Sequence, residues 1–219
     1  MRIRSFLAAA GLFTATSQLH AQTAFIASEG AFGTPAGYLH WVDKGPEYTV
    51  VSNPFTIAAT GISNTATVWK AGGTFQRLSN QNSWGGNFAP LEPLLYNASG
   101  DPMHFDFANA IHQFGLQINS DQPIDVPWSA SISAYDFSNT LLGTFSAFGV
   151  RTDSFDDTAL FLGVGSSTNI YHVVVSTNAD FVVSDVSLDA ATETTPEPAS
   201  LVLLATGIGA IAFLRRRRA

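Results

Sequence analysis

Short runs of β-branched and aromatic residues, separated by clusters of Gly, Pro, Asn, Asp and Ser, fill the chain from Thr23 to Ala190. This pattern is typical of antiparallel strands joined by turns, and no helical periodicity persists for long in this stretch. The predicted strands are 48–51, 55–60, 65–70, 93–96, 103–107, 113–118, 129–137, 141–148, 159–164, 171–177 and 181–188. About ten strands at this spacing predict an all-β fold, an antiparallel two-sheet sandwich of the jelly-roll type.

The clearest alternation of small or apolar with polar residues lies in segment 129–137. Successive side chains of a strand point to opposite faces, so every second residue shares the face that packs on the core. The members of that face are Ala130, Ile132, Ala134 and Asp136. The polar residues 138–140 then predict a turn into 141–148, which makes a hairpin.

The first 21 residues have the design of a secretory signal peptide. Arg2 and Arg4 precede an apolar run from Phe6 to Ala15, and Ala21 ends a polar approach to the cleavage site. A retained membrane helix is the alternative, but an apolar run this short favours the signal peptide. The pattern therefore predicts export.

The chain ends in three consecutive signals: a Pro-Glu-Pro triplet at 196–198, an uncharged apolar run at 199–214, and four arginines. Sixteen helical residues span about 24 Å, which makes a short membrane helix. The arginines favour the cytoplasmic side of the inner membrane. The residues of the predicted sorting signal are Pro196, Glu197, Pro198, Arg215, Arg216, Arg217 and Arg218.

This order of signals resembles the PEP-CTERM sorting signal of exported bacterial proteins, which implies recognition and cutting by an exosortase. A plain C-terminal anchor is the alternative. The predicted organisation is a signal peptide at 1–21, a β-sandwich at 22–190, a linker with the motif at 191–198, a transmembrane helix at 199–214 and a cytoplasmic basic tail at 215–219. Lipid attachment through a thiol is excluded because the chain has no Cys.

The segment from Gln76 to Leu188 resembles the ectodomain of one PEP-CTERM group, through ordered blocks such as SWGGNFAP at 83–90 and FVVSDVSL at 181–188. Members of that group usually have no assigned activity. The resemblance implies a surface or matrix protein associated with exopolysaccharide or biofilm. One departure is Leu91-Glu92, where the group tends to have Gly-Asp, which puts a metal or turn role for this position in doubt.

Charge and cysteine content exclude some partners and sites. Six of the ten basic residues lie in the two terminal signals, which leaves four against all seventeen acidic residues. Binding to nucleic acid or to anionic lipid needs Lys and Arg, so neither is expected. Without Cys the domain has no disulfide and no thiolate metal site.

The sequence gives no catalytic motif. Gly-x-Ser-x-Gly is absent, and the four histidines after the signal peptide, His40, His104, His112 and His172, lack the spacing of a helical zinc motif. Three glutamates that fall in or near loops, Glu29, Glu47 and Glu92, are not paired by any pattern. We therefore expect a protein that is not an enzyme.

Two weak ligand signals remain. Asp153, Asp156 and Asp157 lie in one acidic loop and offer the hard oxygen ligands that Ca²⁺ prefers, although a solvated turn with negative charge is the preferred explanation. Trp84 lies in a Gly- and Asn-rich run, outside any alternating strand, and is the least core-like of the aromatic residues, so it is the candidate for an exposed sugar-binding face, with a place in the core as the alternative.

Three classes of function stay open. The first is a non-enzymatic exported surface or matrix protein, with extracellular polysaccharide as its partner. The second is a carbohydrate-binding β-sandwich, which predicts exposed aromatic side chains along one face. The third is a secreted hydrolase, which predicts acidic side chains that converge in a cleft.

Overall fold

A computed structural model describes residues 22–190. The predicted signal peptide (1–21), linker (191–198), transmembrane helix (199–214) and basic tail (215–219) lie outside the described residues. Within residues 22–190, no helix is long and apolar enough to cross a membrane.

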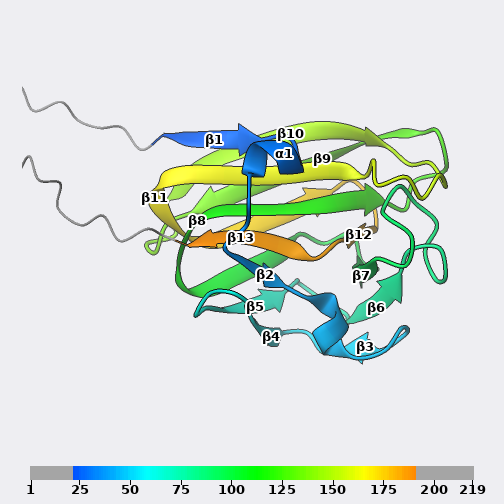
Figure 1. Ribbon diagram of the computed structural model, residues 1–219, viewed down its shortest axis with the longest axis horizontal. Helices are drawn as coiled ribbons and strands as arrows, with labels where there is room; N and C mark the ends of the chain where they lie inside the picture. The colour runs from blue at the N-terminus through cyan, green and yellow to red at the C-terminus, as the bar shows by residue number, and fades with distance from the viewer. Residues whose placement is uncertain (1–21, 191–219) are drawn as a thin grey trace, which may run out of the picture.

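The fold is all-β, as predicted, and its thirteen strands all pair antiparallel within one hydrogen-bonded network (Figure 1). The strands are β1 (Thr23–Ile26), β2 (Gly37–Leu39), β3 (Val50–Val51), β4 (Phe55–Ala58), β5 (Thr65–Trp69), β6 (Phe75–Ser79), β7 (Pro93–Asn97), β8 (Met103–Ser120), β9 (Pro127–Tyr135), β10 (Leu141–Val150), β11 (Leu160–Thr177), β12 (Phe181–Val183) and β13 (Val186–Ala190). A short helix α1 (Glu29–Phe32) and a 3₁₀ helix η1 (Trp41–Lys44) complete the described elements.

Strands β8 and β11 each have 18 residues and run through both layers of the sandwich. The prediction of separate strands at 103–107 and 113–118, and at 159–164 and 171–177, is wrong, because each pair is two halves of one continuous strand. The pairing of β11 with β8 shifts register around Ile170. These irregularities bend both strands without ending them.

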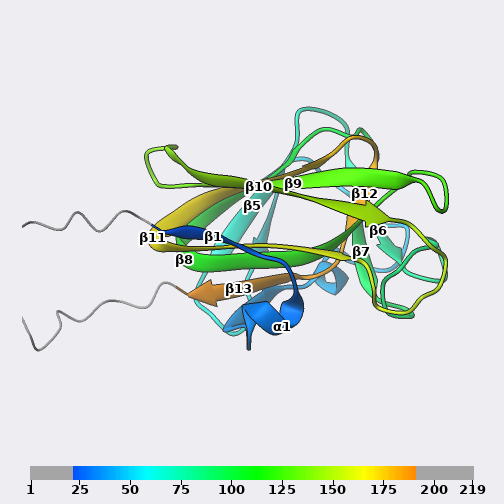
Figure 2. The same cartoon turned by 90° about the horizontal axis from the view of Figure 1, so that it is seen from above.

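The halves of β8 and β11 belong to different layers. One layer is β10-β9-β11-β8-β5-β4, built on residues 172–177 of β11 and 103–107 of β8. The other contains β1, the first half of β11, the second half of β8, β13 with β2, and the series β12-β7-β6-β3. Figure 2 shows β9 and β10 on one side and β13 with α1 on the other.

The core lies between these layers, and β9 contributes to it as its alternation predicted. Ala130, Ile132 and Ala134 are buried in one cluster with side chains of the opposite layer, such as Leu116 and Val164. The β9–β10 hairpin is also confirmed.

Asp136 does not join the core face. It lies past the end of β9, where Oδ1 accepts hydrogen bonds from the backbone N–H groups of Ser138 and Thr140. The prediction for Asp136 is wrong because its carboxylate stabilises the turn, as aspartate often does.

The predicted strand 181–188 is instead two strands, β12 and β13. They are separated at Ser184, whose Oγ accepts from the backbone N–H of Gln117, and Asp185, whose carboxylate accepts from the backbone N–H of Trp41. These hydrogen bonds to side chains take the place of backbone–backbone hydrogen bonds of the sheet at the break. β1, β2 and β6 were not predicted.

β1 begins and β13 ends at the same end of the domain (Figure 1), and one surface hollow is lined by both Gln22 and Ala190.

Candidate functional site

A groove of about 410 Å³ opens on the solvent side of β5, β8 and β11, beside the turn that joins β9 to β10. The side chains that line it include Trp69, His104, Asp106, Phe137, Tyr171 and His172. Asp136 and Asn139 of the turn close one side. Aromatic, acidic and imidazole groups therefore share one hollow, which we call the aromatic–histidine groove.

Strand register brings these side chains together from distant parts of the chain. Trp69 lies opposite His104 in the β5–β8 pair, and Asp106 lies opposite His172 in the β8–β11 pair. The residues on either side of His104 and of Asp106 are buried. Because side chains alternate along a strand, both polar groups face away from the core.

The polar groups form a closed network. Trp69 Nε1 donates to Asp106 Oδ2 at 2.6 Å, and Asp106 Oδ1 accepts from His172 Nδ1. Nε2 of His172 lies 3.3 Å from Nδ1 of His104. The His104 ring in turn stacks on the Trp69 indole, with ring centroids 3.7 Å apart. The network thereby orients both imidazole rings.

His104 is less basic than a free histidine. Burial lowers its pKa below the ordinary value of 6.5, and the neighbouring His172 lowers it further, while Asp106 acts in the opposite direction. A neutral imidazole has one nitrogen that donates and one with a free lone pair. The surroundings of His104 in the groove therefore favour the uncharged form of its imidazole.

The rim of the groove carries an exposed aromatic side chain. Phe137 is 81% exposed, and its ring meets that of Tyr171 edge to face, with centroids 5.2 Å apart. An apolar ring held in solvent beside polar groups is a common feature of ligand sites. The exposed Phe137 ring therefore offers an apolar face to a ring-shaped ligand.

Sequence reasoning did not identify this groove. One signal was available: in the segment 103–107, His104 and Asp106 alternate with Met103, Phe105 and Phe107. That pattern indicates a strand with two chemically active side chains on its solvent face. It does not indicate His172, which is 68 residues from His104.

A second cavity, of about 250 Å³, gathers acidic side chains next to α1 and the β12–β13 break. Glu29, Glu92 and Asp185 line it together with Phe32 and Phe161. Of the three glutamates that the sequence left unpaired, two thus share one cavity. We call it the acidic pocket.

Burial dominates the charge state of the acidic pocket. It raises the pKa of Glu92 to about 7, although the backbone N–H of Ala89 donates to this carboxylate and opposes the rise. Burial also raises the pKa of Glu29, assisted by Asp157. The pKa of Asp185 rises for the same reason, against the opposing hydrogen bond from His40 at 2.7 Å.

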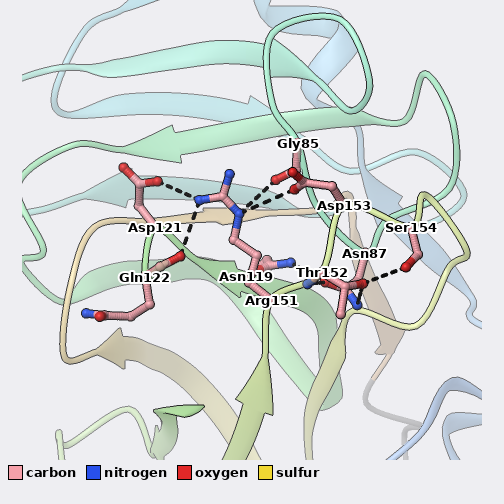
Figure 3. Close-up of polar contacts among 9 residues, drawn as sticks. All are labelled: Gly85, Asn87, Asn119, Asp121, Gln122, Arg151, Thr152, Asp153 and Ser154. Atoms are coloured by element: carbon pink, nitrogen blue, oxygen red, sulfur yellow. Dashed lines mark hydrogen bonds and ion pairs between the residues drawn. The ribbon is translucent and has the colours of Figure 1, made fainter. Parts of the chain in front are cut away.

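The three aspartates proposed as calcium ligands do not converge. Asp153 lies 3.8 Å from Arg151 Nε (Figure 3), Asp156 accepts from Thr158, and Asp157 accepts from Gln117. Among residues 22–190, no group of three or more His, Asp or Glu side chains is placed to hold a metal ion. The loop geometry therefore gives the calcium hypothesis no support.

Arg151 holds the acidic loop against its neighbours (Figure 3). Nε donates to the carbonyl of Gly85 at 3.0 Å, and an Nη donates to Asp121 at 2.8 Å. Beside it, Asn87 Oδ1 accepts from the backbone N–H of Thr152 at 2.7 Å. These bonds tie the loop to the run 80–87.

Trp84 is not exposed, so the expectation of an exposed face at this residue is wrong. The side chain is 8% exposed and packs in a small core cluster with Leu78, Phe88 and Leu94. The Arg151 guanidinium covers its ring at 4.8 Å. The Gly- and Asn-rich run folds back on the sheet, and its one large apolar side chain is buried there.

Comparisons with solved structures find only distant similarities. A family 6 carbohydrate-binding module is 15% identical, with a TM-score of 0.34, over 57% of this chain and 93% of that one. The CBM22-1–GH10 modules of Clostridium thermocellum xylanase 10B are 9% identical, with a TM-score of 0.34, over 73% and 29%. A DUF4465 family protein from Bacteroides caccae is 8% identical, with a TM-score of 0.37, over 77% and 100%. Similarities this low carry no information about ligands.

No curated protein matches the chain. A family model of the PEP-CTERM protein-sorting motif matches residues 194–218. That range contains the Pro-Glu-Pro triplet, the apolar run and the four arginines. The protein therefore carries a PEP-CTERM sorting signal at its C-terminal end, as an exported protein of this kind does.

Proposed function

We propose that this protein is an exported, non-enzymatic cell-surface or matrix protein whose β-sandwich binds extracellular polysaccharide in the aromatic–histidine groove. An exosortase processes its tail, and the apolar run 199–214 anchors it in the inner membrane until then. Its surroundings would be an exopolysaccharide or biofilm matrix. The observation that carries the binding proposal is the exposed aromatic rim beside fixed polar groups.

The groove chemistry suits a sugar ring. The rings of Phe137 and Tyr171 offer apolar faces to the C–H side of a sugar, and Phe137 already stands in solvent. The oxygen atoms of Asp136 and Asn139 can accept from hydroxyl groups. A few polar groups on an otherwise aromatic surface would fix the orientation of the ligand.

The charge of the chain limits the classes of polysaccharide that we expect it to bind. With four basic residues between the terminal signals, the domain has little to neutralise an anionic polymer. The groove itself contains Asp106 and Asp136. We therefore infer neutral or amino-bearing polysaccharides in place of sulfated or uronic ones.

Binding of the full chain, in detergent, to a glycan array tests the proposal. Phe137→Ala removes the rim and should weaken binding about fivefold to tenfold, since a stacked aromatic contributes on the order of 1–1.5 kcal/mol. Phe148→Ala is the matched control, because Phe148 of β10 is also 81% exposed but does not line the groove. Equal loss in both variants, or no glycan bound by the unmodified chain, would refute binding in this groove.

The acidic pocket supports a second candidate, a secreted hydrolase. Glu92 and Asp185 place two carboxyl groups in one cavity, and a pair of carboxyl groups that act as acid and base is what glycoside cleavage needs. Release of reducing sugar from a bound polysaccharide, lost in Glu92→Gln, would support this candidate. If no sugar is released at any pH between 5 and 8, the non-enzymatic proposal stands.

A further inference from the structure

The two histidines of the groove lie with a ring nitrogen of one close to a ring nitrogen of the other. Nδ1 of His104, on β8, lies 3.3 Å from Nε2 of His172, on β11. His172 Nδ1 is hydrogen-bonded to the Asp106 carboxylate. A carboxylate only accepts, so Nδ1 of His172 carries a proton, and in the neutral ring Nε2 then has the free lone pair. That lone pair points at the other imidazole.

The spacing of these nitrogens matches two ligands of one metal ion. Histidine nitrogens bind zinc at about 2.0–2.1 Å, and at the tetrahedral angle two such nitrogens lie about 3.3–3.4 Å apart. The observed 3.3 Å is therefore the separation of ring nitrogens that a shared ion requires. In the free protein the same spacing allows His104 Nδ1–H to donate to His172.

The surroundings of the pair are those that ligating histidines require. A ligating histidine usually donates its other N–H to a carboxylate, which fixes the ring and makes the ligand more basic. Asp106 has this position for His172, and Trp69 Nε1 holds Asp106 from the other side at 2.6 Å. The Trp69 ring also fixes His104, with an interplanar angle of 7°.

We propose that His104 and His172 bind a divalent transition-metal ion of the class that prefers imidazole, with Zn²⁺ as the reference ion. Binding needs the His104 proton to move from Nδ1 to Nε2, so no net proton is released. Two protein ligands leave the remaining positions of the ion to water, or to hydroxyl or amino groups of a molecule in the groove. Asp106 and Trp69 are positioning residues.

This inference does not depend on polysaccharide binding. Co²⁺, which shows visible absorption when bound by nitrogen ligands, is the probe, and calorimetry with Zn²⁺ gives the affinity of the full chain in detergent. We expect one ion per chain, with loss of binding in both His104→Ala and His172→Ala. Asp106→Asn should weaken binding about 10–100-fold. His112→Ala is the control, because His112 bonds to Asn169 and does not line the groove.

Absence of Co²⁺ and Zn²⁺ binding by the unmodified chain would overturn the proposal, as would binding that survives loss of either groove histidine. If a variant fails to fold, nitrogen NMR of the unmodified chain decides. Zn²⁺ must then shift Nδ1 of His104 and Nε2 of His172, and no shift at these atoms refutes the site. A chain that binds Zn²⁺ but no glycan would retain the metal site and refute the polysaccharide proposal.

Discussion

The Trp69 indole lies flat on the His104 imidazole, with 3.7 Å between ring centroids and 7° between ring planes. The same indole donates from Nε1 to Asp106, which holds the second histidine of the groove. One side chain on β5 therefore orients groups on both β8 and β11. The contribution of each contact can be measured separately.

Trp69→Phe keeps an aromatic face for His104 but removes the donor to Asp106. We expect the free energy of unfolding to fall by about 1 kcal/mol, because Asp106 is partly exposed and water replaces some of the lost bond. A double-mutant cycle with Asp106→Ala, which removes the acceptor, isolates this bond from the change in ring size when measured by urea unfolding. A coupling energy near zero would show that the bond does not contribute to stability.

Glu92→Gln should stabilise the protein at pH 8 and not at pH 4. The folded-state pKa of about 7 lies above the ordinary 4.5, so the folded state holds the proton more tightly. That contribution is fully present below pH 4.5 and is lost as the pH rises through 7. Glutamine cannot ionise, and at pH 8 it should recover about 2–3 kcal/mol.

Thermal unfolding at pH 4 and at pH 8 measures this difference. Asp125→Asn is the control, since Asp125 lies on the surface at φ 63°, a conformation that asparagine tolerates well. A stability gain from Glu92→Gln that is equal at both pH values would contradict the expected ionisation.

Leu91→Gly should also stabilise the fold. Leu91 has φ 64° and is 60% exposed, so it has a strained backbone and few contacts to lose. Glycine adopts this conformation without strain, and its greater freedom in the unfolded chain offsets only part of the gain. We expect about 0.5–1 kcal/mol by urea unfolding. Leu91→Ala keeps the Cβ and should bring no gain.

Arg151→Lys should destabilise the protein by about 1–3 kcal/mol. Lysine keeps the charge but lacks the guanidinium fork that bonds to Gly85 and Asp121 and covers Trp84. Asp153→Asn is the comparison, because this exposed partner lies 3.8 Å away and should contribute less than about 1 kcal/mol. Similar losses in both variants would show that charge, and not the fork, matters.

Replacement of Pro196, Glu197 and Pro198 by alanine should leave membrane insertion intact and block release in a host with an exosortase. We expect the apolar run and the arginines to supply insertion, whereas the triplet is the part of the motif outside them. Fractionation of cells and medium, with deletion of residues 215–218 as the comparison, separates the two roles. Unchanged release would refute sorting by the triplet.

Local pattern predicted the parts of the fold that depend on neighbouring residues. The alternation through Ala130, Ile132 and Ala134 gave the core face of β9 correctly. It could not decide whether 103–107 and 113–118 are one strand or two. Residues 108–112 contain neither a breaker that would separate two strands nor a clear alternation that would join them. Their conformation is set by pairing with β11 and β13.

The groove and the acidic pocket depend on long-range register, which a sequence does not display. His104 and His172 meet because β8 and β11 pair, and Glu29 meets Glu92 across a cavity between distant segments. Trp84 was misjudged because its Gly-rich surroundings resemble a surface loop, whereas Arg151 and Leu94 cover it.

β1 and β13 place both ends of the folded chain on one side of the domain. A cut near Glu197 falls beyond Ala190, the last residue of β13, so every strand of the described part of the chain lies on the N-terminal side of the cut. In the proposed processing, the fragment that leaves therefore contains every residue that lines the aromatic–histidine groove.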